Sequence, residues 1–178
     1  MKIAKPYLIA EIGVNFYDTA KIMGISPLEA AKLYIDKVAE AGINCAKFQS
    51  YKAGTIVSKN SPAYWDTTKE PTKTQYELFL KHDSFGAAEY QELSDYTHAK
   101  VIDFTSTPFD YTSADYLENM VDFYKISSSD LSNLPFIRHI GAKGKAVVLS
   151  VGAAYLSEVD EAIRTLKEAG CTDITILH

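Results

Sequence analysis

Short apolar segments alternate with helix-like segments along the whole chain, and this alternation limits the possible folds more than any other feature. We expect strands at residues 7–12, 43–49, 101–107, 121–127, 146–152 and 173–178. No hairpin signal joins any two of these segments. Alternation of this kind is typical of parallel strands joined by right-handed crossover helices. The sequence therefore predicts an α/β fold with parallel strands.

Helix signals stand between the expected strands. The sequence Ser26-Pro-Leu-Glu29 has the form of a capping box with proline in the first turn, and Gly42 follows the end of the helix that it predicts. A second cap is predicted at Ser157 to Asp160, with the helix ending before Gly170. The remaining helices are expected at residues 76–80, 86–97, 110–119 and 132–140. Residues 14–25 are a polar stretch to which no helix or strand is assigned. Residues 50–74 form a long connection, which is expected to be functional or mobile and is a candidate lid.

The same alternation fits either a doubly wound sheet or a barrel. No G-x-G-x-x-G pattern follows the first strand, which disfavours a dinucleotide-binding sheet. Every expected strand ends in polar residues, as they do where reactive groups surround the C-terminal mouth of a barrel. We therefore predict a TIM (β/α)8-type barrel that is incomplete, with about six strands in residues 1–178, because a whole barrel takes about 250 residues. The chain is expected to be the N-terminal part of a longer protein.

Composition and charge exclude several classes of function. The formal net charge is −5 and the lysines are scattered, so a nucleic-acid partner is not expected. No apolar run approaches the roughly 20 residues of a membrane span, and the N-terminus has no signal-peptide core. We expect a cytoplasmic protein without a membrane partner. Cys45 and Cys171 have no metal-type spacing and are expected to be buried free thiols.

The segment 123–133 contains the most informative single residue, Lys125. It lies in the middle of an apolar strand, where a buried ammonium is unfavourable unless an anion or a carboxylate accompanies it. The other strand ends add further polar groups, namely Glu11, Lys47, Gln49, residues 105–107, Ser127, Ser128 and Ser150. Two lysines among several hydroxyls are suited to a phosphate or a carboxylate, and one acid could move a proton. The alternative is that each residue is a core polar group satisfied by its neighbours.

Several short motifs occur in the same order as in a known family. They are Ala10–Asn15, Lys47–Gln49, Ser106–Phe109, Lys125–Asp130, Asn133–Pro135, Gly144–Lys145, Ser150–Gly152 and Leu177–His178. Together they resemble the sialic acid synthase (N-acetylneuraminate synthase) family across essentially the whole chain. The resemblance implies a TIM-barrel enzyme that condenses phosphoenolpyruvate with an N-acylated amino sugar, releasing phosphate and forming a nonulosonic acid. The sugar would be N-acetylmannosamine or a diacetamido sugar.

The resemblance also implies roles for individual residues. Lys47 and Lys125 would hold phosphoenolpyruvate, together with the hydroxyls of Thr107, Ser128 and Ser150. Glu11 would handle the attacking water or its proton, and Gln49 would contact the sugar. A divalent metal, manganese or magnesium, would polarise the sugar aldehyde. Its histidine ligands belong to later strands, so no metal ligand is expected in this chain. The whole enzyme would be a homodimer with a C-terminal antifreeze-like domain that is absent here.

The sequence departs from the family pattern at two positions, and two alternative functions are still compatible with it. Phe16 follows Asn15 where the family usually has histidine, and Val151 replaces a threonine between Ser150 and Gly152. Without the later strands, we expect the fragment alone to be inactive. One alternative is a synthase that makes a 3-deoxy sugar acid from phosphoenolpyruvate and a phosphorylated sugar. The other is a non-catalytic anion-binding or scaffold domain.

Overall fold

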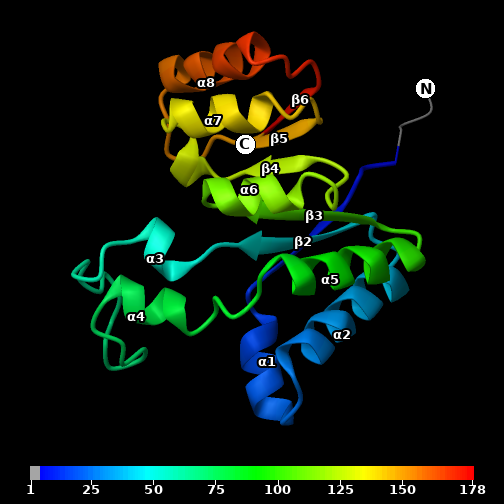
Figure 1. The fold of residues 1–178 in the computed structure, drawn as a ribbon, viewed down its shortest axis with the longest axis vertical. Helices are drawn as coiled ribbons and strands as arrows, with labels where there is room; N and C mark the ends of the chain where they lie inside the picture. Colours follow the sequence, from blue (N-terminus) through cyan, green and yellow to red (C-terminus); the bar gives the residue numbers. More distant parts are fainter. Residues whose placement is uncertain (1–4) are drawn as a thin grey trace.

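Six parallel strands follow one another in sequence order through the computed structural model, which describes residues 5–178 (Figure 1). One sheet contains β1 (Ile9–Gly13), β2 (Cys45–Ser50) and β3 (Asp103–Pro108), and the other contains β4 (Tyr124–Ile126), β5 (Val147–Ser150) and β6 (Ile174–Leu177). Every pairing within the two sheets is parallel. The predicted α/β fold with parallel strands is therefore confirmed.

The two sheets lie side by side at β3 and β4. The amide of Asp122 donates to the carbonyl oxygen of Phe104 at 2.9 Å, and the hydroxyl of Thr105 donates to the carbonyl oxygen of Phe123 at 2.6 Å. These bonds continue the strand order from β1 to β6. Membership of an eight-stranded barrel stays a prediction.

Helices form an outer layer against the strands. Their bounds are α1 Phe16–Met23, α2 Pro27–Glu40, α3 Ala53–Ile56, α4 Gln75–Leu80, α5 Ala87–Ala99, α6 Tyr111–Leu117, α7 Leu134–Gly141 and α8 Leu156–Glu168, with a 3₁₀ turn, η1, at Ser128–Asp130. Helices α2, α5, α6, α7 and α8 contact one another in that order (Figure 1). The strands place Phe48, Phe104 and Leu149 against this layer, fully buried. Since side chains alternate along a strand, the neighbouring residues face the other side, where Lys47 and Lys125 lie.

Three of the sequence-based expectations about these elements are wrong. Residues 14–25 contain helix α1, which forms because Phe16 is buried against Phe48 and Phe85 and because Gly24, at φ +68°, ends the helix. Strand β3 begins at Asp103 and not at Val101, which is exposed. Helix α8 begins at Leu156, two residues before the expected start, because the Glu158 carboxylate accepts the amide hydrogen of Tyr155.

The connection after β2 forms a projection that we call the arm, residues 51–86, which contains α3 and α4 and extends away from the strands (Figure 1). Its base is fixed by two carboxylates. Asp83 accepts the amide hydrogen of Ala53 at 2.9 Å, and Asp110 accepts the hydroxyl hydrogen of Thr55 at 2.6 Å. Asp110 also caps α6 by accepting the amide hydrogen of Ser113. The arm is thereby anchored beside the C-terminal end of β3.

Replacing Asp110 with alanine is expected to lower the free energy of unfolding by about 2 kcal/mol, because the cap of α6 is lost together with the hydrogen bonds that Asp110 accepts from the Thr55 hydroxyl and the Lys52 amide. Urea unfolding followed by circular dichroism measures this change. Asp66→Ala is the control, since the Asp66 carboxylate is exposed and its side-chain partners are the nearby residues Thr68 and, at 3.9 Å, Lys69. Its effect should stay within about 0.5 kcal/mol. Equal effects of the two substitutions would contradict the anchoring role of Asp110.

Cys45 and Cys171 are buried and unpaired with each other, as predicted. Within residues 5–178, no helix is both long enough and apolar enough to cross a membrane.

Candidate functional site

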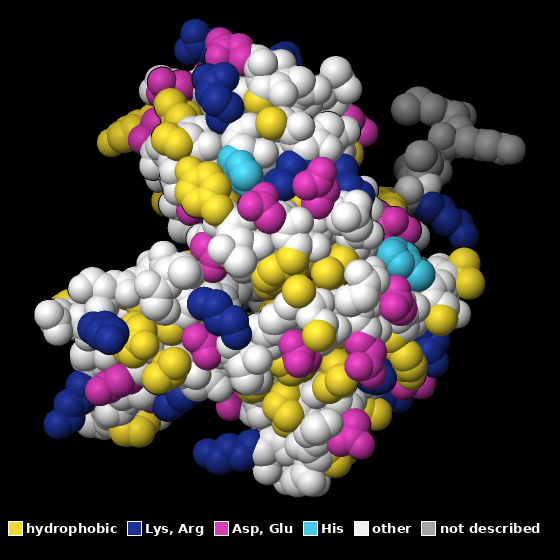
Figure 2. Space-filling view, in the orientation of Figure 1, with side chains coloured by type: hydrophobic (Ala, Val, Ile, Leu, Met, Phe, Trp, Pro, Cys, Tyr) yellow, Lys and Arg dark blue, Asp and Glu magenta, His cyan; other side chains and the backbone are white. Residues whose placement is uncertain are grey.

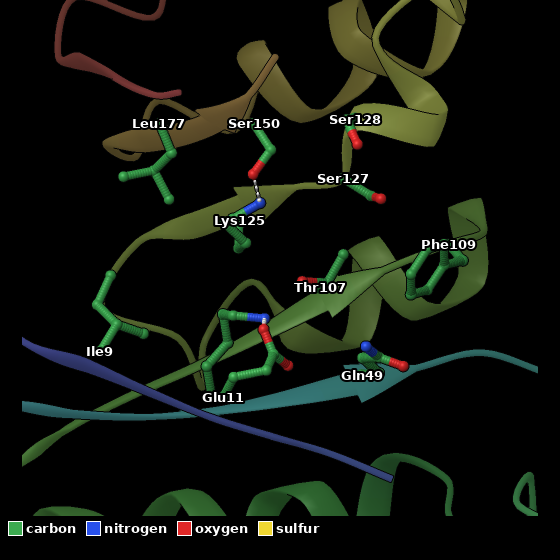
Figure 3. A pocket seen from close by; sticks show the side chains of 11 residues that line it. Ile9, Glu11, Gln49, Thr107, Phe109, Lys125, Ser127, Ser128, Ser150 and Leu177 are labelled. Carbon is green, nitrogen blue, oxygen red and sulfur yellow. Dashed lines mark hydrogen bonds and ion pairs between the residues drawn. The ribbon is translucent and has the colours of Figure 1, made fainter. Parts of the chain in front are cut away.

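All of the predicted site residues line one cavity at the C-terminal ends of the strands, with a volume of about 320 Å³ (Figure 3). They are Glu11, Lys47, Gln49, Thr107, Lys125, Ser128 and Ser150. The parallel register explains this convergence. Glu11 stands opposite Lys47, and Gln49 stands opposite Thr107, so polar residues at the ends of neighbouring strands become neighbours in space. Ile9, Phe109, Ser127 and Leu177 complete the lining.

The two lysines have different partners. Lys47 on β2 is buried and forms an ion pair with the carboxylate of Glu11, whose side chain is half-exposed. Lys125 on β4 is equally buried, but its Nζ donates to two neutral oxygens, the carbonyl of Ile126 and the hydroxyl of Ser150, each at 2.7 Å. The Lys125 pKa falls to about 8, mainly because burial disfavours the ammonium, with a further lowering by Lys47 and an opposing effect of Glu11.

A glycine makes the position of Glu11 possible. The pairing of β1 with β2 shifts by one residue between Glu11 and Gly13, and Gly13 adopts φ +60°, a conformation that is unfavourable for other residues. A side chain at this position would also stand 3.4 Å from the Gln49 amide nitrogen and 3.5 Å from the Glu11 carboxylate. Gly13 therefore allows β1 to bend while Glu11 and Gln49 approach each other.

The hydroxyls come from the turn after β4. Ser127 caps η1 by accepting the amide hydrogen of Ser129, and Ser128 is the first residue of the turn. Gly152, after β5, lies against Ser128, since a β-carbon there would stand 3.6 Å from the Ser128 hydroxyl oxygen. In Figure 3, Ser127 and Ser128 lie near Lys125 at one end of the cavity. Hydroxyl donors thus accompany the lysine that has no carboxylate partner.

A second cavity of about 440 Å³ adjoins the first and shares Gln49 and Phe109 with it. The arm contributes Gln75 and Phe79 to its wall. Asp130, in the turn that follows β4, also lines this cavity. Burial raises the Asp130 pKa. The long connection at residues 50–74 was expected to be functional or mobile because of its length, and Tyr51, Thr55 and Ile56 from it line this cavity.

The site as a whole favours a small anion. Two buried lysines and one glutamate leave a positive balance in the cavity, and buried donors to an oxyanion are worth more than donors in water. Both lysines present ammonium donors, and the serines and Thr107 present hydroxyls. The half-exposed Glu11 is the one carboxylate in the lining that is able to accept a proton from a bound molecule.

The described residues do not fit a metal ion. Among residues 5–178, no group of three histidine, cysteine, aspartate or glutamate side chains gathers closely enough to hold one. Two of the histidines have carboxylate partners on the outer surface, His98 with Asp122 at 2.8 Å and His139 with Asp115 at 2.6 Å. No step of the chemistry is therefore assigned to a metal held by these residues.

Comparison with known proteins places the chain in a family. The NeuB family model matches residues 34–178. This chain belongs to the NeuB family. The resemblance found from the motifs is thereby confirmed, and of the predicted site residues only Glu11 lies before the matched segment.

Named relatives of this NeuB chain include synthases of several nonulosonic acids. It is 35% identical to the N,N'-diacetyllegionaminic acid synthase of Campylobacter jejuni over 98% of this chain and 51% of that protein. It is 27% identical to the human N-acetylneuraminate-9-phosphate synthase over 90% of this chain and 43% of that protein. The chain thus spans about half the length of the curated relatives that it matches.

Solved structures agree with this assignment. The crystal structure of the N-acetylneuraminic acid synthetase from Leptospira borgpetersenii matches with a TM-score of 0.79 and 27% identity, over 100% of this chain and 58% of that one. A truncated 3-deoxy-D-arabino-heptulosonate 7-phosphate synthase from Thermotoga maritima matches with a TM-score of 0.61 and 13% identity, over 84% of this chain and 45% of that one. The second likeness shows a shared fold alone.

Proposed function

We propose that the protein carrying this NeuB chain condenses phosphoenolpyruvate with an N-acylated amino sugar, N-acetylmannosamine or a diacetamido sugar, to give a nonulosonic acid and phosphate. The observation that carries the proposal is the convergence of Lys47, Lys125 and several hydroxyls on one small cavity in a member of this family. Phosphoenolpyruvate has an anionic group at each end. Two separated lysines with hydroxyl donors match that distribution of charge.

Each residue has a proposed role in binding. Lys125, with Ser128 and Ser150 beside it, holds one anionic end of phosphoenolpyruvate. Lys47 holds the other end from β2, aided by Thr107 on β3. A bound anion would draw Lys47 away from its ion pair with Glu11. The freed Glu11 carboxylate would then accept a proton from the attacking water near the reacting carbons.

The sugar is proposed to occupy the second cavity, which shares Gln49 with the first. The family resemblance implies a divalent metal that would polarise the sugar aldehyde, and its ligands are proposed to lie outside this chain. On the same grounds we propose that the rest of the barrel and a C-terminal domain belong to the whole protein. The whole protein is proposed to be cytoplasmic and to form a homodimer. Light scattering measures the mass of the particle and so tests the homodimer.

The proposal is tested by measuring phosphate release from phosphoenolpyruvate with N-acetylmannosamine or a diacetamido sugar and manganese. The protein extended to the length of its relatives should release phosphate only when an amino sugar is present. Residues 1–178 alone should bind phosphoenolpyruvate without turnover. Sugar-independent phosphate release, or no release with any N-acylated sugar, would contradict the proposal.

A synthase that uses a phosphorylated sugar is disfavoured by the arrangement of charges. Such an enzyme needs cations for a second phosphate. The second cavity is lined by no lysine or arginine among the described residues, and it includes Asp130. Arg138 pairs with Glu168 and Arg164 pairs with Asp160, both on the outer helices. Neither arginine is available at the mouth of the site.

Phosphoenolpyruvate affinity is expected to fall as the pH rises through about 8, because Lys125 binds the anion as an ammonium and loses its proton there. Above that pH, binding requires re-protonation, which weakens affinity by up to about tenfold for each pH unit. Titration calorimetry between pH 7 and pH 9.5 measures the change. The Lys125→Arg variant, whose side chain stays charged, should lose this pH dependence. An affinity that is constant over this range in the unsubstituted chain would contradict the role given to Lys125.

A further inference from the structure

The cavity contains two lysines, and among residues 5–178 only Lys47 has a carboxylate partner. Lys47 pairs with Glu11, so its positive charge is compensated when no ligand is bound. Lys125 is just as buried, and its hydrogen-bond partners, the Ile126 carbonyl and the Ser150 hydroxyl, are neutral. The ionisable groups that share the cavity with Lys125 are Lys47 on β2 and Glu11 on β1. Burial lowers the Lys125 pKa, Lys47 lowers it further and Glu11 opposes this change, so the neutral amine of Lys125 becomes accessible.

The geometry of the Lys125 nitrogen suits a nucleophile. An ammonium has three N–H donors, and two acceptors at 2.7 Å account for two of them. In the neutral amine these two bonds persist, and the third position of the nitrogen carries the lone pair. Because Lys125 lines the cavity, a carbonyl carbon bound there lies within reach of this lone pair (Figure 3). Desolvated lysines beside a second cation are a recognised source of amine nucleophiles.

The remaining lining indicates which carbonyl compound fits. Lys47 supplies a cation for a carboxylate, and Ser127 and Ser128 supply hydroxyl donors. Ile9 and Leu177 provide an apolar wall (Figure 3). A volume of about 320 Å³ admits a small molecule with a carboxylate, an adjacent carbonyl and a short apolar end. These are the features of a short 2-oxo acid without a phosphate.

We propose that Lys125 is a carbonyl-reactive nucleophile that forms a reversible Schiff base with small 2-oxo acids such as pyruvate, an activity beyond the condensation proposed above and independent of it. The amine nitrogen attacks the carbonyl carbon, and the carbonyl oxygen takes up a proton to give a carbinolamine. Loss of water then leaves the C=N bond. Glu11, the carboxylate in the lining, moves the proton. One water is released and no oxidant or reductant is needed.

The experiment traps the imine on residues 1–178 with pyruvate and sodium cyanoborohydride, which supplies the hydride that reduces it to a stable secondary amine. Mass spectrometry should find one predominant pyruvate adduct, and peptide mapping should place it on Lys125. The yield should rise at least severalfold between pH 7 and pH 8.5. Phosphoenolpyruvate in excess should suppress the adduct, because both ligands need the same lysines.

Controls separate this activity from general lysine reactivity. Lys143 is a partly buried lysine outside the cavity, bonded to Asp115 and Glu118, and it should remain unmodified in the same sample. The Lys125→Arg variant should give no site-specific adduct, and circular dichroism reports whether it folds. If it does not fold, the mapped site and the suppression by phosphoenolpyruvate in the unsubstituted chain decide the question.

Two results would overturn the proposal. One is the absence of an adduct in a sample that binds phosphoenolpyruvate by calorimetry. The other is an adduct distributed evenly over exposed lysines such as Lys37 and Lys69. Because binding of phosphoenolpyruvate is measured separately, failure of the Schiff base leaves the proposed condensation unaffected. Failure to bind phosphoenolpyruvate, with the adduct still on Lys125, would refute the condensation alone.

Discussion

Replacing Lys125 with methionine is expected to weaken phosphoenolpyruvate binding about 10- to 100-fold. The substitution removes a charged donor to the ligand, and such hydrogen bonds contribute about 1.5–3 kcal/mol. Methionine keeps the length and apolar character of the side chain. Since a buried ammonium without a carboxylate partner is costly, the variant should be at least as resistant to urea as the unsubstituted chain. Loss of binding with retained stability is the signature of a residue that serves a ligand.

The matched control for this experiment is Lys32→Met. Lys32 is a partly buried lysine on α2 that pairs with Glu92 at 2.5 Å, and it does not line the cavity. Its replacement should leave the affinity for phosphoenolpyruvate unchanged within error. If Lys125→Met binds as tightly as the control in titration calorimetry, the cavity is not the phosphoenolpyruvate site.

Replacing Glu11 with glutamine in the whole protein is expected to lower turnover by about 10²- to 10⁴-fold, the usual contribution of a general acid or base. Affinity for phosphoenolpyruvate should be equal or higher, because the substitution removes a carboxylate that competes with the ligand for Lys47. Phosphate release gives the turnover and calorimetry gives the affinity. The two quantities should therefore change in different directions.

This combination also separates an enzyme from a scaffold. In a non-catalytic anion-binding domain, Glu11→Gln would change binding or stability, and there would be no sugar-dependent turnover to lose. Glu92→Gln is the control, since its exposed carboxylate pairs only with Lys32 among the described residues. Full turnover in the Glu11→Gln variant would contradict the proton-transfer role.

The convergence of the site was predictable because it follows from strand topology. Lys47, Lys125 and Ser150 each lie near the C-terminal end of an apolar segment, and parallel strands bring those ends to one side. Helix α1 was not predictable from periodicity, since its eight residues form a helix through the packing of Phe16 in the core. The arm likewise depends on contacts between residues far apart in sequence, Ala53 with Asp83 and Thr55 with Asp110, which local sequence does not reveal.

The distribution of partners between the lysines was also beyond sequence reasoning. Lys125 was expected to need an anion or a carboxylate, and the structure gives the carboxylate of Glu11 to Lys47 instead. That choice depends on the register of β1 with β2 and on the bend at Gly13. Residue types alone contain no such information. The difference between the two lysines is nevertheless the basis of the pH dependence and of the carbonyl chemistry proposed for Lys125.

The central claim is that this cavity binds phosphoenolpyruvate between Lys47 and Lys125. A crystal structure of residues 1–178 with phosphoenolpyruvate tests it most directly. The account predicts one ligand in the cavity of Figure 3, with one anionic end bound by Lys125 and Ser128 and the other by Lys47. A ligand bound elsewhere, or a cavity without ligand at a concentration that saturates binding in solution, would contradict it.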